Sequence, residues 1–453
     1  MRVDAVQLAA SPTSTRPSWV AQWYVLIMMC AVYTLSIADR YVISTVLEPI
    51  RLELRLTDFM VNMSAGLPLA IFYLAFGFPL SWLIDRGSRR NIVAFCLVAW
   101  SAMTMLCGRA QSALQFGLAR IGVGIGEAGG TPGANSILSD YFSAPMRPMA
   151  LAVFSLGAPA GAWLAAQFAG HVADGKGWAA HMAALLAGIH GWRAVFIVLG
   201  APGIVAGLLI FLTVREPRRG QLDVRADHPA PSIRETWKFL LGQKAALNLM
   251  LASAITAFWG WGLMWFTPTF LQRTYGMTPG EAGELVGPMH LWGGILATVV
   301  TSWVIAQPWF TRDCRRIVWF LGAGIGLATV PSFIVYYTHS LDVVRAMLWI
   351  FVPAIYFYIG PCFGLLNNLS PPPMRAIFCA TTLLMANLGN LILAPALGGL
   401  LSDWFAEGPS GDAASLRLAL LCLAPTGFWA TYHYFTCTRT MLEDEERATG
   451  VRA

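Results

Sequence analysis

The chain is built from apolar blocks of about 20 residues, and this feature constrains its fold more than any other. Of its 453 residues, 57% are hydrophobic and 12% are charged, whereas about 25% of the residues of a soluble protein are charged. A block of about 20 apolar residues is long enough to cross the hydrocarbon core of a bilayer as a helix. The sequence therefore predicts an all-α membrane protein embedded in the lipid bilayer.

Twelve such blocks can be placed along the chain. We expect spans at 20–47, 61–84, 91–109, 112–138, 149–171, 192–214, 246–272, 282–306, 316–338, 343–368, 374–401 and 415–437. One long polar stretch separates the sixth span from the seventh, which predicts an N-terminal six-helix bundle (1–214), a cytoplasmic linker (215–241) and a C-terminal six-helix bundle (242–453). The segment 171–190 is expected to be an extended external loop with a short surface helix.

The distribution of basic residues predicts the orientation. Cytoplasmic loops of membrane proteins carry an excess of Lys and Arg. With both termini cytoplasmic, fifteen basic residues fall in inner loops and eight in outer loops. We therefore expect a multi-pass protein of the cell (inner) membrane with both termini inside. The formal net charge of +6 follows from these loops and does not indicate a nucleic-acid partner.

The expected fourth span carries two ionisable residues, Arg120 and Glu127. Such a residue inside a spanning helix costs about 2.5–3.5 kcal/mol on insertion scales, so it is retained where it faces protein or a watery cavity. Residues seven apart differ by only about 20° around a helix, and we therefore expect the two side chains to meet on one face. The surrounding glycines allow a neighbouring helix to approach closely.

The first span adds Asp39 and Arg40, at a depth similar to that of Arg120. A carboxylate beside a guanidinium stays ionised, so we hypothesise that Glu127 takes up a proton when the two helical bundles rock and separate it from Arg120. Asp39 would titrate in the same way, and Arg120 would then hold an anionic headgroup. This makes Asp39, Glu127 and Arg120 candidate proton-coupling residues, and Arg40 and Arg120 candidate substrate-binding residues. The alternative is a fixed structural pair that holds helices one and four together.

The two halves differ in character. All four intramembrane charges lie in the N-terminal half, while helices seven to ten carry many aromatic residues, among them Trp259. A cavity with one charged and one aromatic wall suits an amphiphile with an acyl tail better than a sugar. Thr131 and Asn135 extend the polar face of helix four, so we include these two and Trp259 among the candidate substrate-binding residues. Alternatively, the aromatic residues face lipid as interfacial belts, and the polar pair bonds across helices.

Other chemistry is not indicated. Gly124-x-Gly126-x-x-Gly129 matches a dinucleotide-binding fingerprint, but that motif needs a preceding strand and a helix start, and here it lies within a spanning segment. The eight cysteines have no CxxC or metal-ligand spacing. No HExxH or serine-nucleophile motif lies in or beside the spans. We expect no enzyme activity, no metal and no cofactor.

The loop between the second and third spans carries a family resemblance. Ser81-x-x-x-Asp85-Arg86-x-Ser88-Arg89-Arg90 resembles the signature loop GxxxD(R/K)xGRR of the major facilitator superfamily, with Ser at both glycine positions. A weaker copy, Ser302-Trp303-Val304-Ile305 before Arg312, lies at the same place in the second half. The resemblance implies two parallel repeats and a latch in which Asp85 contacts the start of helix eleven, with Arg86, Arg89 and Arg90 in neighbouring ion pairs. The alternative is a solvated basic loop that enforces the topology.

Several further stretches resemble the Spinster family of lipid transporters. They are Asp39-Arg40-Tyr41, the run from Arg120 to Ala128 that contains GIGEA, Gly157-Ala158-Pro159-Ala160-Gly161, Gly191-Trp192-Arg193 with Phe196, and Leu388-Gly389-Asn390 with Ala394-Pro395, Gly398 and Ser402-Asp403. The last set is similar to the pattern LGDxxSPxxxGxxSD, with Asn390 in place of its aspartate. The Asp-Arg pair also occurs in organic-anion symporters of the superfamily.

This resemblance implies a function. We expect a twelve-helix facilitator-superfamily fold and proton-linked transport of lysophospholipid or sphingosine-1-phosphate-like lipids by alternating access, with the chain acting as a monomer. The proton-linked role of the helix-one Asp and the helix-four Glu is likewise implied by the resemblance. The alternative is a proton-coupled symporter of small organic anions such as sugar acids, which would bind carboxylates through Arg40 and Arg120.

Overall fold

The computed structural model describes residues 18–143, 146–177, 180–181, 184, 188–217, 233–371, 374–408 and 411–449, and the regular structure in these ranges is entirely helical. In the N-terminal half the helices are α1 (Trp19–Leu54), α2 (Asp58–Ala65), α3 (Leu67–Arg86), α4 (Arg89–Cys107), α5 (Ala113–Glu127), α6 (Gly130–Tyr141), α7 (Arg147–Ser155), α8 (Gly157–Trp163), α9 (Ala169–Ala173) and α11 (Gly191–Thr213). A π-helical segment, η1 (Leu164–Phe168), joins α8 to α9.

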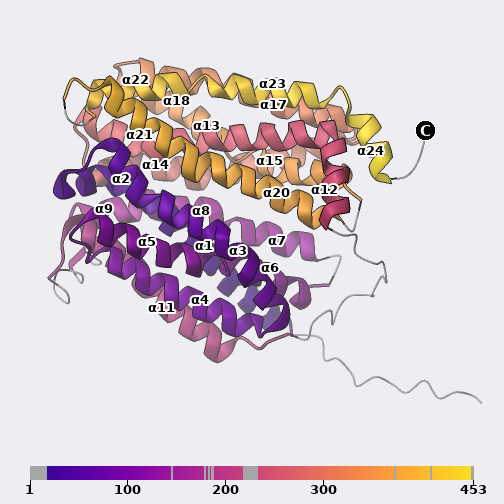
Figure 1. Cartoon of the computed structure of the whole chain (residues 1–453), viewed down its shortest axis with the longest axis horizontal. Coiled ribbons are helices and arrows are strands. Elements are labelled where there is room, and N and C mark those ends of the chain that lie inside the picture. Colours follow the sequence, from indigo (N-terminus) through magenta and orange to yellow (C-terminus); the bar gives the residue numbers. More distant parts are fainter. Residues whose placement is uncertain are drawn as a thin grey trace, which may run out of the picture.

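The C-terminal half is likewise built of helices. Helix α12 (Ile233–Gly242) falls almost wholly within the expected linker. The helices that follow it are α13 (Lys244–Tyr275), α14 (Pro279–Pro288), α15 (Gly294–Ile305), α16 (Pro308–Thr311), α17 (Cys314–Tyr337), α18 (Leu341–Ala354), α19 (Ile359–Asn368), α20 (Arg375–Asn387), α21 (Ala394–Phe405), α22 (Ala413–Leu423), α23 (Thr426–Cys437) and α24 (Met441–Thr449). The π-helical segments η2 (Met289–Gly293) and η4 (Leu388–Leu393) interrupt two of the long helices. Figure 1 shows the two halves as two bundles of roughly parallel helices lying one above the other.

The helices agree with the expected spans. Within the described ranges, eleven helical segments are long and apolar enough to cross a membrane. The expected fourth span, 112–138, differs because it consists of α5 and α6, which are separated at Ala128–Gly129 and are each too short to count alone. Much of 171–190 lies outside the described residues, so the expected surface helix there is not tested. Residues 218–232 of the expected linker also lie outside, and we keep the division at 215–241 as a proposal.

Polar residues at the starts of several helices fix where those helices begin. Ser88, Ser112 and Asp412 accept hydrogen bonds from backbone N–H groups in the first turns of α4, α5 and α22. Such caps satisfy amide groups that have no partner within the helix. Ser88 stands where the signature loop has a glycine, so this departure from the pattern supplies the cap of α4.

The beginning of α1 and the last described helix, α24, lie at one end of the bundle (Figure 1), which we call the terminal end; the opposite end is the far end. The beginning of α1 lies beside the ends of α6 and α11, because Gln22 donates to the Tyr141 carbonyl at 2.9 Å and the Tyr24 and Thr213 hydroxyls are 2.6 Å apart. Helices α12 and α24 lie at the same end, on the right of Figure 1, while α2, α9 and α22 lie at the far end.

Glycines in α5 bring the charged segment against its neighbours. A Cβ on Gly124 would lie 2.4 Å from the Leu69 carbonyl oxygen of α3, and one on Gly126 would lie 2.9 Å from the Trp100 backbone nitrogen of α4. Small residues permit this kind of backbone approach between membrane helices. The glycine run therefore serves helix packing, and it places Glu127 inside the N-terminal bundle, where it has no exposed surface.

Candidate functional site

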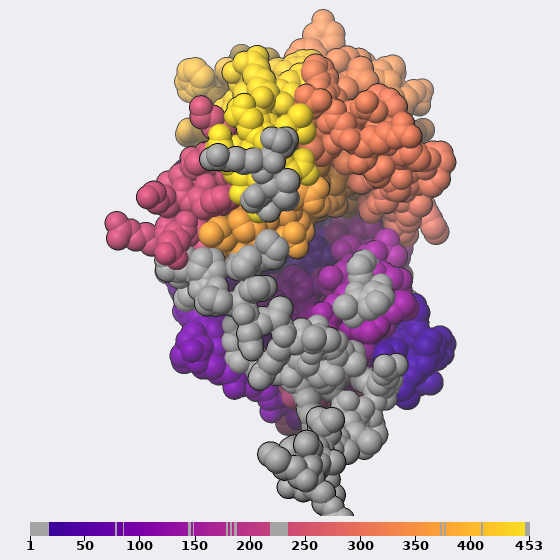
Figure 2. All heavy atoms as spheres, turned by 90° about the vertical axis from the view of Figure 1, so that its right-hand side faces the viewer, coloured from indigo at the N-terminus to yellow at the C-terminus, as the bar shows by residue number. Residues whose placement is uncertain are grey.

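A central cavity of about 530 Å³ lies between the two halves. Residues of α1, α3 and α6 form one wall, and residues of α13, α19, α20 and η4 form the other. Figure 2, which faces the terminal end, shows a hollow between the N-terminal half below and the C-terminal half above. The volume falls within the range of roughly 300–1,000 Å³ typical of small-molecule sites.

Arg40 is the single charged residue among the described residues that line the central cavity. Its Nε lies 2.7 Å from Oε2 of Glu127, and the guanidinium carbon lies 4.2 Å from the ring centroid of Tyr73. Glu127 is fully buried behind it. Removing one partner of a buried ion pair destabilises a protein by about 3–5 kcal/mol, because the other charge is left buried and unpaired. The cavity therefore presents a cation whose counter-ion is hidden in the N-terminal half.

The pairing of Arg120 with Glu127 that the seven-residue spacing predicts does not form, because Arg40 takes that place. Arg120 instead donates to the carbonyl oxygens of Ala65 at 3.1 Å and Asp39 at 3.3 Å. Ala65 ends α2, and carbonyls in the last turn of a helix have no partner within it. The break between α2 and α3 thus provides an acceptor that the sequence spacing could not reveal.

Asp39 is not among the residues that line the cavity, and its side chain contacts α4 instead. Its Oδ2 accepts a hydrogen bond from Thr104 at 2.7 Å, and its Oδ1 is buried without a hydrogen-bond partner among the described residues. Asp39, Arg40, Arg120 and Glu127 are all buried. Two carboxylates and two guanidinium groups therefore make a cluster, which we call the four-charge cluster, with a net charge of zero when all are ionised.

The aromatic wall of the cavity is formed by a different tryptophan from the one expected. Trp259 is fully buried inside the C-terminal half, where its Nε1 donates to Ser332 at 3.1 Å. Trp261 lines the cavity instead and packs against Tyr41 of the opposite wall, with ring centroids 4.6 Å apart. The expectation for Trp259 is therefore corrected. Helix α13 is buried on nearly every side, so its sequence has no apolar stripe that would identify the inward face.

The two polar residues expected beyond Glu127 are placed differently from each other. Thr131 lines the central cavity, whereas Asn135 is exposed and is not among the lining residues. The cavity wall supplied by the C-terminal half carries two amide side chains, Asn387 and Asn390. The expected pattern has two residues between its acid and Ser-Pro, but three residues separate Asn390 from Ala394-Pro395. The extra residue lies in η4, whose π-helical turn is wider than an α-helical one.

The basic residues of the signature loop bond within the N-terminal half. Arg89 donates to Asp140 and Glu216, and the guanidinium of Arg86 lies over the Trp82 ring at 4.2 Å. Asp85 lies in α3, but its side chain is outside the described part. Among the described contacts of Arg86, Arg89 and Arg90, none reaches the C-terminal half. The latch between halves remains a prediction.

Glu216 holds the end of α11 against the start of α4. Its carboxylate accepts hydrogen bonds from the Arg90 backbone at 2.7 Å, Arg89 at 2.9 Å and Ser88 at 3.0 Å. Burial alone would raise the pKa of the Glu216 carboxyl, but these hydrogen bonds outweigh burial and hold that pKa below its usual value. The Glu216 carboxylate is therefore ionised at neutral pH.

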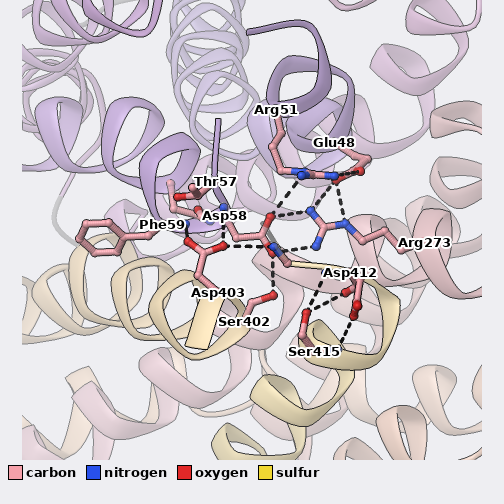
Figure 3. A network of polar contacts seen from close by, with 12 residues as sticks. Glu48, Arg51, Thr57, Asp58, Phe59, Arg273, Ser402, Asp403, Asp412 and Ser415 are labelled. Carbon is pink, nitrogen blue, oxygen red and sulfur yellow. Dashed lines mark hydrogen bonds and ion pairs between the residues drawn. The ribbon is translucent and has the colours of Figure 1, made fainter. Parts of the chain in front are cut away.

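The far end of the cavity is closed by an ion-pair network between the halves, shown in Figure 3. Arg273 of α13 contacts Glu48 of α1 and Asp58 of α2, at 2.6 Å in each case. Arg51 pairs with Glu48 at 2.7 Å, and Ser402 of α21 donates to Asp58 at 2.6 Å. We call these five residues the far-end network. Since Arg273 comes from one half and both carboxylates from the other, the network joins the halves.

A second device reinforces this closure. The carboxylate of Asp403, at the end of α21, accepts hydrogen bonds from the backbone N–H groups of Asp58 at 2.9 Å and Phe59 at 2.7 Å. These amides open α2, so a negative charge from the C-terminal half caps a helix of the N-terminal half. A Cβ on Gly399 would lie 2.9 Å from the Asp58 carbonyl oxygen, which explains why α21 needs a glycine there.

The sequence did not identify this far-end closure. In the sequence, Arg51 and Arg273 are two of the eight basic residues expected in outer loops. Ser402-Asp403 occurs there only within the last of the motifs that resemble the Spinster family. One available signal was the pair Glu48 and Arg51 at the end of helix one, because charges three apart on a helix lie side by side. Their partner in α13, 222 residues further along the chain from Arg51 to Arg273, had no local signal.

Comparison with known proteins places this architecture in a family. The model of the Major Facilitator Superfamily matches residues 29–392. The chain belongs to the major facilitator superfamily. It is thus a multi-pass membrane protein of a family of secondary transporters, as the expected fold class required. A crystal structure of a bacterial homologue of the human lysosomal transporter Spinster, in an inward-facing and unoccupied conformation, is similar to this chain with a TM-score of 0.85 and 29% identity, covering 94% of this chain and 99% of the other.

Two relatives found by sequence cover nearly the whole of this facilitator-superfamily chain. An MFS-type efflux pump of Mycolicibacterium smegmatis is 30% identical over 89% of each chain. A probable L-galactonate transporter of Escherichia coli is 25% identical over 96% of this chain and 93% of its own length. The resemblance to Spinster seen in the motifs is confirmed at the level of the whole structure by the similarity to the bacterial Spinster homologue.

Proposed function

We propose that the chain is a proton-linked transporter of lysophospholipid or sphingosine-1-phosphate-like lipids that works by alternating access as a monomer, without a cofactor or enzyme activity. The observation that carries the proposal is the asymmetry of the central cavity, where one guanidinium, that of Arg40, faces a largely apolar and aromatic opposite wall. An anionic headgroup would bind Arg40, and an acyl chain would lie against the apolar side chains. The likeness to the bacterial Spinster homologue supports this choice of substrate class.

Proton coupling follows from the electroneutrality of the four-charge cluster. If an anionic headgroup takes the place of Glu127 at Arg40, the buried Glu127 carboxylate loses its partner. An unpaired buried charge is costly, so the site favours the neutral form of the acid. Binding of one anion would thus be accompanied by uptake of about one proton. Asp39 and Arg120 complete the cluster, and in this proposal they set the charge balance without contacting substrate.

The described conformation fits one state of such a cycle. The far-end network is closed and the cavity opens toward the terminal end (Figure 2). We propose that the terminal end is cytoplasmic and that the chain resides in the cell membrane, because most loop arginines and lysines lie at that end. The opposite state would break the far-end network and bring Asp85 and its basic neighbours against the other half.

Transport into proteoliposomes tests the proposal. Vesicles containing the purified protein should exchange a labelled lysophospholipid between leaflets faster at an imposed pH gradient than without one. Arg40→Gln should abolish the protein-dependent rate, while Arg315→Gln, an exposed arginine paired with Asp313, should leave it unchanged. Absence of any protein-dependent flux of lysolipid would contradict the proposal.

A second candidate is symport of small organic anions, supported by the full-length similarity to the probable L-galactonate transporter. Arg40 would bind a carboxylate in this case as well. Competition separates the candidates, because a hexuronate in excess should not inhibit lysolipid flux if the lipid is the substrate. Saturable, gradient-driven uptake of the hexuronate itself would favour the second candidate.

A further inference from the structure

The central cavity contains a polar group that no described contact uses. The side-chain oxygen of Asn390 is buried and has no hydrogen-bond partner among the described residues. Leaving a buried acceptor unpaired is costly, and buried polar groups are rarely left without a partner. Asn390 lies in η4 and lines the cavity, and π-helical turns are found frequently at functional sites. The Asn390 side chain as a whole is half-buried, so a rotation of its amide would present the unpaired oxygen to a ligand in the cavity.

Among the described residues that line the cavity, the charge is of one sign and lies on one wall. Arg40 is the sole charged group among the described lining residues, and its counter-ion Glu127 is fully buried. The wall opposite Arg40 offers neutral amides, from Asn387 and Asn390. A cationic group of a ligand would therefore find no carboxylate on the described surface of the cavity.

Aromatic rings are the other usual partners of a cation, and four of the six aromatic residues among the described lining residues are already engaged. The ring of Tyr73 is covered by the Arg40 guanidinium at 4.2 Å. Tyr41 and Trp261 face each other with centroids 4.6 Å apart. The ring of Tyr33 stacks on Phe154 at 4.7 Å. A quaternary ammonium group would have to separate these pairs before it could use their faces. The rings of Tyr358 and Phe363 also line the cavity, so the preference against an ammonium group rests on the lack of a carboxylate on the described lining.

We propose that Asn390 is a specificity-determining residue that hydrogen-bonds an uncharged hydroxyl of the substrate headgroup while Arg40 binds its anionic group. The inference rests on the proposed lipid-transport function and narrows its substrate class. It assigns lysolipids with an anionic, hydroxyl-bearing headgroup, such as a phosphoglycerol, in preference to those with an ammonium group. An amide suits a hydroxyl because it both donates and accepts hydrogen bonds.

Binding to the purified full-length protein tests the inference. The probes are lysophosphatidylglycerol and lysophosphatidylcholine with the same acyl chain, and the readout is the dissociation constant of each. The wild-type protein should bind the glycerol lipid about 10-fold more tightly, because a site built to hydrogen-bond a hydroxyl discriminates against a ligand that lacks it. Asn390→Leu should weaken binding of the glycerol lipid by about 10-fold and leave the choline lipid nearly unchanged.

Asn390→Asp keeps the shape of the side chain and supplies a carboxylate, so it should shift the preference toward the choline lipid even if the leucine variant folds poorly. Asn368→Leu, at an exposed position of α19 outside the cavity lining, is the control and should leave both constants unchanged. Equal affinity of the wild-type protein for the two lipids, or an unaltered preference in Asn390→Asp, would overturn the inference alone. Failure of both lipids to bind would overturn the proposed lipid function together with it.

Discussion

The capping of α2 by Asp403 allows a quantitative prediction about the conformational equilibrium. Asp403→Asn keeps one acceptor oxygen but removes the negative charge and one of the two hydrogen bonds to the amides of Asp58 and Phe59. A charge at a helix N-terminus is worth about 0.3–1 kcal/mol, and a hydrogen bond to a charged group about 1.5–3 kcal/mol. The sum is about 2–4 kcal/mol, and its lower end already corresponds to a roughly 30-fold change in an equilibrium constant.

Because the cap joins the two halves only when the far end is closed, this loss should favour the state that is open at the far end. Hydrogen–deuterium exchange measured by mass spectrometry can detect the shift in the full-length protein. In Asp403→Asn, exchange should rise in α2 and at the end of α21, and it should fall in the segments that line the cavity at the terminal end. The fall at the terminal end distinguishes a conformational shift from local fraying of α2.

Asp313→Asn provides a matched control. Asp313 also caps a helix, by accepting from the backbone N–H of Arg315 at 3.0 Å, but this contact lies within the C-terminal half. Its loss should raise exchange only at the start of α17. The reasoning would be refuted if Asp403→Asn raised exchange in α2 alone, or if Asp313→Asn produced the same opposed changes at the two ends.

Two further predictions concern stability and use thermal unfolding of the purified protein. Glu216→Gln should lower the free energy of unfolding by about 1–2 kcal/mol at neutral pH. Because the pKa of Glu216 is lower in the folded than in the unfolded protein, this loss of stability is complete above about pH 4.3, the pKa of an unfolded Glu. The loss disappears as the pH falls through the lowered pKa of the folded state. A difference that stays constant down to strongly acidic pH would contradict that assignment. Gly124→Ala should destabilise by about 1–3 kcal/mol, because the added Cβ would overlap the Leu69 carbonyl at 2.4 Å. Gly77→Ala, with open space around its Cβ, should be neutral or slightly stabilising, and equal effects of the two substitutions would rule out the packing argument.

The membrane fold could be predicted from the sequence because its main signal is local. Apolar blocks of helical length and the bias of basic residues in loops do not depend on partners far along the chain. Charged residues inside the spans were also found correctly, since each of Asp39, Arg40, Arg120 and Glu127 is buried. The sequence could not predict which of these charged residues contact each other, because those contacts depend on which helices meet and on where a helix ends.

Arg120 shows why the pairing was missed. Seven-residue spacing places Arg120 and Glu127 on one face of a helix, yet Arg40 of α1 binds Glu127 and the end of α2 provides the acceptor Ala65 for Arg120. In the same way, Arg273 binds two carboxylates from the other half, and nothing near Arg273 in the sequence indicates them. Contacts between the halves require the three-dimensional arrangement.

The most direct test of the central claim is the number of protons taken up when an anionic lysolipid binds. Calorimetric titration in buffers of different ionisation enthalpy measures this number at a fixed pH. If the headgroup displaces Glu127 from Arg40, the wild-type protein should take up about one proton per bound lipid and Glu127→Gln should take up about none while still binding. Binding without proton uptake by the wild-type protein, or the same uptake in Glu127→Gln, would contradict the account.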